Sequence, residues 1–299
     1  MPDPLAWVEQ LTGGRVTRAE RLRGGWTSEM RRVEVDLPHG SQTFVLRAFV
    51  DEFFVKHAHG LLTREATILG QLADTDVPAA ACVGVDAEAR YCDQPSLLMT
   101  LLPGSVHVEE AGAADRARQL ARQLAAIHRV EVEEQPREYQ PWTAPDRVRV
   151  PSATSRPEVW AAAVDYLRRE PPKYEGTFLH RDFHPGNVLF DGGRVSGVVD
   201  WVETSWGPAD LDVAHCSTAL ALLHGVEAGR EFSSLYAAGG GRDLARADDH
   251  RYWLLLDALA FAPDAEKVAE PWRDLGRTDL SPELLQERLE LYLESVIKR

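Results

Sequence analysis

The order of predicted segments in residues 1–102 constrains the fold more than any other feature of the sequence. Five stretches carry strand signals, in this order: RVTRAERL, MRRVEVDL, QTFVLRAFV, AACVGVD and SLLMTLL. A helix is predicted between the third and the fourth, where LLTREATILGQLAD repeats apolar residues at helical spacing. The turn PHGS joins the second and third strands, so an antiparallel arrangement is expected. The N-terminal part is therefore expected to be a five-stranded antiparallel sheet with one main helix.

The rest of the chain has a different character, and Pro103-Gly104 marks the change. AADRARQLARQLAAIHRV is strongly amphipathic, and the sequence from residue 209 onward is nearly all helical in pattern. Residues 131–157 are rich in proline and glutamate and predict a long loop. We expect an α+β protein with two lobes, residues 1–102 and residues 103–299, the second mostly helical.

The stretch FLHRDFHPGNVLF and the segment after it bring polar residues together. Asp182 follows a short predicted strand, Asn187 begins the next one, and Asp200 ends the strand that returns after the turn DGG. Two carboxylates and an amide oxygen are hard donors of the kind that Mg²⁺ prefers. Phosphoryl transfer needs such a metal site and a residue that orients the attacking hydroxyl.

Protein kinases carry this layout as His-Arg-Asp, an asparagine five residues after the aspartate, and a later metal-binding aspartate. HRDFHPGN followed by VSGVVDWVETSWGPADLDVAH resembles more closely the aminoglycoside phosphotransferase and choline kinase-like family of small-molecule kinases. His184 stands where protein kinases place a lysine, and no Ala-Pro-Glu segment follows Asp200. The resemblance covers roughly residues 20–260 and implies a two-lobed protein-kinase-like fold.

The resemblance also implies roles for the residues of this motif. Asp182 would be the catalytic base or hydroxyl orienter, and Asn187 and Asp200 would bind Mg²⁺. His180 and Asp212 would support the loop, whereas His184 would either contact the transferred phosphate or cap the turn.

In the N-terminal lobe the resemblance predicts a nucleotide site for ATP or GTP. Gly24, Gly25 and Ser28 would cover the phosphates, and Arg47 with Glu65 would replace the usual lysine–glutamate pair. Arginine keeps the charge but is not interchangeable with lysine, and without the other motifs this pair would be interpreted as a surface ion pair.

The segment SLLMTLLPG would link the two lobes, with Met99 and Leu101 near the adenine edge. The plain alternative is a buried strand, which we expect this segment to form as well.

Charge and cysteine content indicate which class of ligand the protein binds and in which cellular compartment it is expected. The net charge of −14, concentrated in residues 200–299, argues against nucleic acid and favours a cationic acceptor. Three cysteines fit a reducing cytoplasm, and neither a signal peptide nor a membrane span is expected. The sequence leaves open a monomer or a homodimer.

The acceptor is not fixed by the sequence. An aminoglycoside-type or other antibiotic is the leading class, followed by a metabolite such as choline, an amino alcohol, homoserine or a sugar. Four aromatic residues could give cation–π contacts to a cation, although most are expected in the core: Trp201, Trp206, Tyr252 and Trp253.

Two other functions compete with a kinase. His180 and His184 have a spacing that could bind zinc on a helix, but Pro185-Gly186 argues against a helix there. A catalytically inactive kinase-like binding protein would explain the missing lysine, but it would not need all three predicted metal and base positions.

Overall fold

The computed structural model describes residues 3–22, 28–263 and 265–298 of the 299-residue chain. The chain forms two compact units. The first comprises Met1–Pro103 and Ser196–Glu203, and the second comprises Gly104–Val195 and Thr204–Arg299. The functional assignment of residues 1–102 to nucleotide binding and 103–299 to catalysis and acceptor binding stays a prediction.

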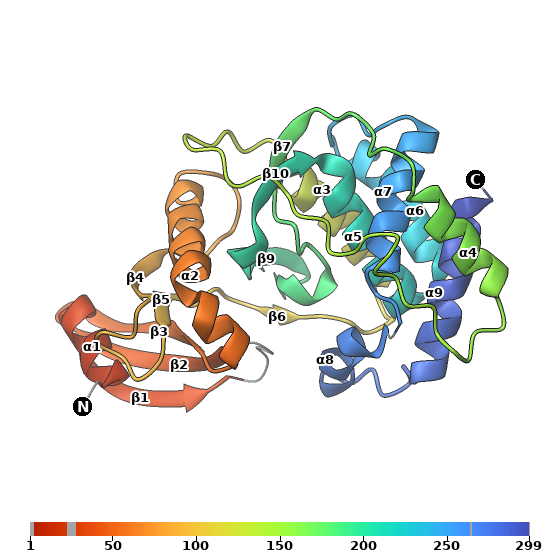
Figure 1. Ribbon diagram of the computed structural model, residues 1–299. Helices are drawn as coiled ribbons and strands as arrows, with labels where there is room; N and C mark the ends of the chain where they lie inside the picture. The colour runs from red at the N-terminus through yellow and green to blue at the C-terminus, as the bar shows by residue number, and fades with distance from the viewer. Residues whose placement is uncertain (1–2, 23–27, 264, 299) are drawn as a thin grey trace. The chain divides into compact units, whose positions relative to one another are not determined.

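The first unit is built on the expected five-stranded antiparallel sheet, in the order β1-β2-β3-β5-β4 (Figure 1). Its strands are β1 (Arg15–Arg21), β2 (Ser28–Leu37), β3 (Gly40–Phe49), β4 (Cys82–Asp86) and β5 (Ser96–Thr100). A short helix, α1 (Pro4–Thr12), ends at Gly13, whose φ of 68° is the left-handed conformation that favours glycine.

The alternation of side chains along β3 decides which residues meet which helix. Phe44 and Leu46 are buried against Trp7 and Val8 of α1. Arg47, one residue further, points to the opposite face because successive strand residues alternate between faces. That face is covered by α2 (Glu52–Leu72). The sheet therefore places the buried, charged side chain of Arg47 on the face that α2 covers.

Helix α2 begins nine residues before the segment in which the sequence predicts a helix. Asp51 caps it, since its carboxylate accepts a hydrogen bond of 2.9 Å from the backbone N–H of Phe53. Apart from Ala58, the side chains of residues 52–60 are not buried. The first turns therefore bury a single apolar side chain, which explains why the pattern placed the start too late.

Residues 196–203 belong to the first unit through contacts with α2 and the segment before β4. The guanidinium of Arg64 donates to the carbonyl oxygen of Val202 at 2.8 Å, and the backbone N–H of Val198 donates to that of Pro78 at 2.8 Å. These contacts hold the segment that contains Asp200.

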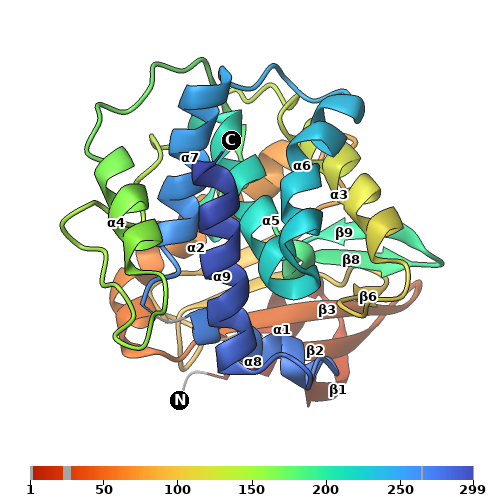
Figure 2. The same cartoon turned by 90° about the vertical axis from the view of Figure 1, so that its right-hand side faces the viewer.

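The second unit is mostly helical, as predicted. Its helices of six or more residues are α3 (Ala113–Ile127), α4 (Pro157–Tyr166), α5 (Ala209–His224), α6 (Val226–Ala238), α7 (Ala247–Leu259), α8 (Ala269–Asp274) and α9 (Pro282–Ile297). Helix α5 lies among α6, α7 and α9, and each residue from 209 to 223 is buried (Figure 2). A helix buried on all sides shows no amphipathic stripe, so the polar residues in α5 need partners inside the protein.

Short strands frame the predicted catalytic loop of the second unit. β7 (Gly176–Leu179) precedes it and pairs antiparallel with β10 (Ser205–Pro208). β8 (Val188–Asp191) follows it and lies between β6 (Ser105–Val106) and β9 (Arg194–Val198). The sequence analysis missed β6, which is two residues long, and β10, which ends in proline. Within the described residues, the helices lack the length or the hydropathy that a membrane span requires.

Candidate active site

The loop after β7 is held in an unusual backbone conformation by Asp212 of α5. Arg181 has a φ of 74°, in the left-handed region that residues with a side chain rarely adopt. The Asp212 carboxylate accepts hydrogen bonds from the backbone N–H groups of His180, at 2.9 Å, and Arg181, at 2.8 Å. These bonds are the structural basis for the loop-support role predicted for Asp212, which stays a prediction.

Asp212 is itself fully buried and depends on a second partner. The Nε2 atom of His128 lies 3.1 Å from its carboxylate, and Tyr236 contacts the other ring nitrogen of His128 at 2.7 Å. Burial acts to raise the pKa of Asp212, but the hydrogen bond and charge of His128 outweigh it and lower that pKa. The loop is thus tied to an ionised carboxylate inside the helical core.

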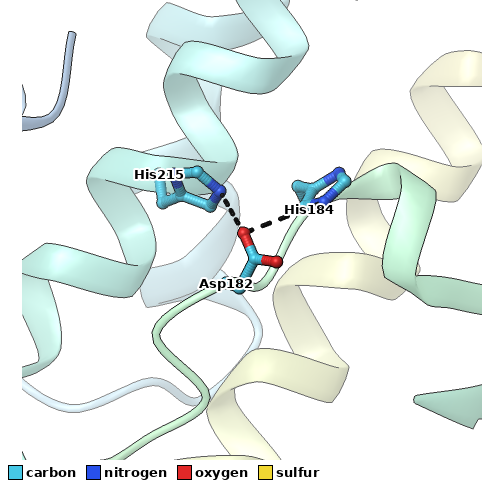
Figure 3. A group of neighbouring side chains, drawn as sticks. All are labelled: Asp182, His184 and His215. Carbon is cyan, nitrogen blue, oxygen red and sulfur yellow. Dashed lines mark ion pairs between the residues drawn. The ribbon is translucent and has the colours of Figure 1, made fainter. Parts of the chain in front are cut away.

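Asp182 lies at the centre of the loop, and its two carboxylate oxygens have different partners. Figure 3 shows His215 and His184 on the side of one of these oxygens. The side-chain amide of Asn187, in the 3₁₀ turn Pro185–Asn187, donates to Oδ2 at 3.0 Å and to the backbone carbonyl of Asp182 at 2.9 Å. Nε2 of His215 lies 3.1 Å from Oδ1, and Nε2 of His184 lies 3.9 Å from the same oxygen. The Asp182 side chain is 31% exposed, so a substrate can reach it.

This surrounding keeps Asp182 ionised. Burial acts to raise the pKa of Asp182, but the hydrogen bond from His215 and the electrostatic effect of the histidines around it hold that pKa well below its usual range. A carboxylate of this kind accepts a hydrogen bond from a hydroxyl and fixes its direction.

Asp182, His184 and His215 lie close enough together to suggest a metal site, with ligand atoms within 4.8 Å of one another. Their hydrogen bonds favour another interpretation. Nδ1 of His184 accepts the backbone N–H of Gly186 at 3.1 Å, which places the proton of the neutral ring on Nε2. Both ring nitrogens of His215 face carboxylates, and a nitrogen that carries a proton does not bind a metal. We therefore assign His215 as a donor to Asp182 and His184 as the residue that caps the turn.

A second cluster lies in the first unit, around Arg47. Its Nη1 atom contacts both carboxylate oxygens of Glu65, at 2.9 and 3.0 Å, and Oδ1 of Asp200 at 3.1 Å. Arg47 and Glu65 are buried, so the interpretation as a surface ion pair is wrong. Burial acts to lower the pKa of Arg47, but Asp200 and Glu65 raise it above its ordinary value, and the guanidinium stays charged.

Asp200 itself is more accessible than its partner. Its side chain is 38% exposed, and its φ of 67° is again left-handed. Two of the three aspartates in the predicted motifs are thus linked to unusual backbone, Asp200 directly and Asp182 through Arg181 beside it. Such backbone often occurs at functional sites because the surrounding structure has to hold it in place.

The other predicted nucleotide residues lie on the same sheet. Ser28 begins β2 and is buried, and Met99 on β5 is half-buried opposite Val45 of β3. Leu101 is exposed, and its N–H donates to the carbonyl of Thr43 at 3.3 Å. Gly24 and Gly25 lie outside the described residues.

Comparison with known proteins decides the family. A family model described as the phosphotransferase enzyme family matches residues 18–290. The chain belongs to the phosphotransferase enzyme family. This family comprises enzymes that transfer phosphoryl groups, and the match confirms the resemblance and the assignment as an enzyme.

Solved structures confirm the kinase-like fold of this phosphotransferase. A candidate aminoglycoside phosphotransferase from Ralstonia eutropha JMP134 is 20% identical, with a TM-score of 0.66 over 98% of this chain and 97% of that one. A thermostable mutant of aminoglycoside phosphotransferase APH(4)-Ia, in ternary complex with ADP and hygromycin B, is 14% identical, with a TM-score of 0.64 over 99% and 98%. Macrolide 2'-phosphotransferase MphH from Brachybacterium faecium is 18% identical, with a TM-score of 0.57 over 94% and 99%. A comparison with curated proteins finds no match.

Sequence reasoning missed several neighbours of Asp182 in this phosphotransferase. His215 and Asp257 lie in buried helices, and Trp142 lies in the loop of residues 131–157. Trp142 is 37% exposed, its ring lies 3.8 Å from Cζ of Arg181, and its centroid lies 5.0 Å from that of His215. A tryptophan in a loop carries no pattern that would single it out.

The aromatic residues that the sequence suggested for an acceptor lie mostly in the core, as expected. Trp201, Tyr252 and Trp253 are buried. Trp206 is half-buried, and its indole occupies the space where a side chain at Gly176 would be.

Proposed function

We propose that this phosphotransferase moves the γ-phosphoryl group of ATP or GTP to a hydroxyl group of a small molecule, with Mg²⁺. The leading acceptor class is an aminoglycoside-type or other antibiotic. The observation that supports this best is the carboxylate of Asp182, which is ionised, partly exposed, and held by Asn187 and His215. Loose transition states of phosphoryl transfer require positioning more than proton abstraction, and this carboxylate is suited to positioning.

In this proposal Asp182 accepts a hydrogen bond from the acceptor hydroxyl and directs its oxygen toward the phosphorus atom. The hydroxyl proton passes to the carboxylate as the new P–O bond forms, while the bond from the γ-phosphorus to the bridging oxygen breaks and the nucleoside diphosphate leaves. His184 caps the turn through Nδ1, which accepts the backbone N–H of Gly186, and in this proposal its Nε2 donates to the transferred group. His180 and Asp212 support the loop that carries these groups.

The nucleotide half of the proposal rests on the first unit. Arg47, fixed by Glu65, supplies a permanent positive charge for the phosphates. Ser28, Gly24 and Gly25 supply backbone donors, while Met99 and Leu101 face the base. An arginine in this position can make paired hydrogen bonds to phosphate oxygens, which a lysine cannot.

The donor atoms fit Mg²⁺. Asn187 directs its amide nitrogen to Asp182, which leaves the amide oxygen as the metal-binding atom, and Asp200 offers an accessible carboxylate. When bound, the ion would neutralise charge on the phosphate oxygens. We propose Asn187 and Asp200 as its protein ligands.

The acceptor is proposed to lie beside Trp142. Its exposed ring is a short distance from Arg181 and His215, which flank or contact Asp182. Aromatic faces bind both sugar rings and cations, and the acidic excess of residues 200–299 favours a cationic acceptor. Structural neighbours include enzymes for hygromycin B and for macrolides, so both classes belong in a screen.

A coupled assay of nucleotide consumption tests the proposal. Purified protein would be given MgATP or MgGTP with aminoglycosides including hygromycin B, macrolides, choline, amino alcohols, homoserine and sugars. We expect acceptor-dependent turnover that Asp182→Asn reduces by at least about 10³-fold, because the variant lacks the charge that orients the hydroxyl. Equal turnover by Asp182→Asn would refute the catalytic assignment. Tight nucleotide binding without turnover on any acceptor would favour a kinase-like binding protein.

A further inference from the structure

His215 connects the loop of Asp182 to a buried carboxylate on another helix. It lies in α5, and its Nε2 faces Oδ1 of Asp182 at 3.1 Å. Its Nδ1 lies 3.0 Å from Oδ1 of Asp257 in α7. The exposed fraction of the side chain is 7% for His215 and 0% for Asp257. The imidazole is therefore placed between two carboxylates and away from solvent.

This geometry fixes the protonation of His215. A carboxylate oxygen accepts hydrogen bonds, so each ring nitrogen that faces one has to carry a proton, and the ring is an imidazolium. The charge of Asp257 requires the same state. Its Oδ2 is buried and has no hydrogen-bond partner among the described residues, so the imidazolium of His215 is the charge that compensates this carboxylate.

The electrostatics agree with the geometry. Burial acts to lower the pKa of His215, but Asp257 and Asp182 together raise it to about 9. The charged and titratable groups that face the ring are Asp182 and His184 from the loop and Asp257 from α7. Its other close ring neighbours, Trp142 and Phe261, carry no charge.

We propose that His215 and Asp257 form a positioning pair for Asp182 in the phosphoryl-transfer reaction. The inference rests on the catalytic role proposed for Asp182. His215 holds Oδ1 while Asn187 holds Oδ2, so the plane of the carboxylate is fixed at both oxygens. Asp257 in turn holds the imidazolium in place, as outer carboxylates commonly orient functional histidines.

The positive charge has a second effect. A nucleotide brings several negative charges close to the carboxylate that directs the acceptor. With a neutral imidazole, Asp182 and Asp257 would contribute two uncompensated negative charges, whereas the imidazolium leaves one. Protonation of His215 therefore lowers the repulsion between this group of carboxylates and the phosphates.

The same unit contains a matched pair that has no contact with the loop. His250 of α7 places Nδ1 2.6 Å from Oδ1 of Asp210 in α5 and Nε2 2.9 Å from the hydroxyl of Ser233. This pair also joins α5 and α7, but here the histidine lies in α7 and the aspartate in α5. Both side chains are largely buried. His250→Gln therefore controls for loss of a helix-connecting histidine.

The first test is kinetic. ADP release from MgATP would be measured for His215→Gln, Asp257→Asn, Asp257→Glu and His250→Gln, with water and with the best acceptor of the screen. We expect His215→Gln and Asp257→Asn to lower kcat about 10- to 100-fold with little change in the KM of MgATP. Asp257→Glu should recover part of the loss, and His250→Gln should keep kcat within about twofold of wild type.

The pH dependence separates positioning from simple destabilisation. Wild-type kcat should fall as the pH rises through about 9, where His215 loses its proton, and the fall should be centred at lower pH in Asp257→Asn. A merely structural pair would change stability and leave the shape of the profile unaltered.

The second test needs no turnover. In ¹⁵N-histidine NMR spectra, the signals absent from His215→Gln identify His215, and we expect both of its nitrogens to be protonated at pH 7.5. A neutral ring at that pH, or wild-type kcat and profile in both His215→Gln and Asp257→Asn, would overturn the inference. If His215→Gln does not fold, Asp257→Asn provides the comparison for both tests. Full activity of Asp182→Asn would instead overturn the proposed function.

Discussion

Replacing Arg47 by methionine should destabilise the first unit by about 3–4 kcal/mol, because it leaves Glu65 buried without its cation. The Glu65 side chain is 2% exposed, and Arg47 contacts both of its oxygens within 3.0 Å. The contact with Asp200 adds little to this cost, since that carboxylate is 38% exposed and water screens it. The predicted loss of stability therefore comes mainly from the buried carboxylate of Glu65, which would have no cation beside it.

A double-mutant cycle tests that explanation. Glu65→Gln removes the buried charge and retains an acceptor for the backbone N–H of Trp201, which Glu65 accepts in the wild type. The double variant should be more stable than Arg47→Met alone by about 1–2 kcal/mol, with a coupling energy of about 2 kcal/mol. Arg18→Met, which breaks an exposed pair with Glu20 in the same sheet, should cost less than about 0.5 kcal/mol.

Hydrogen–deuterium exchange at the amides of α2 and β3 is the suitable assay, because a protein of two units need not unfold in one step. A loss of about 3 kcal/mol appears as exchange that is roughly 100-fold faster. If the double variant exchanges as fast as Arg47→Met, or faster, the unpaired charge of Glu65 is not the cause of the lost stability and the reasoning fails.

Three further predictions concern the second unit. The pKa of His215 is raised to about 9, so its contribution to stability is complete below about pH 6.5 and is lost as the pH rises through 9. The difference in Tm between wild type and His215→Gln should therefore shrink between pH 7 and 10, from a contribution of at most about 3 kcal/mol, and a constant difference would contradict this. Asp212→Asn should lower kcat at least about 10-fold and Tm by several degrees, because the two backbone N–H groups bond to different carboxylate oxygens and an amide keeps only one of these acceptors; unchanged kinetics would show that the loop keeps its shape without both bonds. Trp142→Ala should raise the KM of the acceptor about 10-fold while the KM of MgATP and kcat stay the same, whereas Trp142→Phe should be close to wild type; an unchanged acceptor KM would remove Trp142 from the acceptor site.

The elements that carry strong local patterns could be predicted from the sequence. The five strands of the first sheet and the amphipathic α3 appear where apolar periodicity and turn residues placed them. The fold class followed from their order. The start of α2 was predicted too late, and β6 and β10 were not predicted, because these segments carry no strong local pattern. The first turns of α2 are mostly exposed, and the two strands are very short.

The candidate site was predictable only where the chain itself brings residues together. Asp182 and Asn187 are five residues apart across one loop, so their contact follows from local structure. His215 and Asp257 reach Asp182 through the packing of α5 and α7, two helices that lack an apolar stripe. Arg47 and Asp200 are separated by 153 positions, and only the motif suggested that both mattered.

The membership of Ser196–Glu203 in the first unit has a consequence for how the protein is made. Glu65 and Arg64 of the first unit bind the backbone of the segment Ser196–Glu203. The ribosome adds this segment about a hundred residues after Pro103. Until then Glu65 lacks its backbone partner and Arg47 lacks Asp200. We expect a nascent chain of 1–103 to resist protease poorly, and resistance to rise once the returning segment has left the exit tunnel. Synthesis of the second unit would thus be under way before the first is complete.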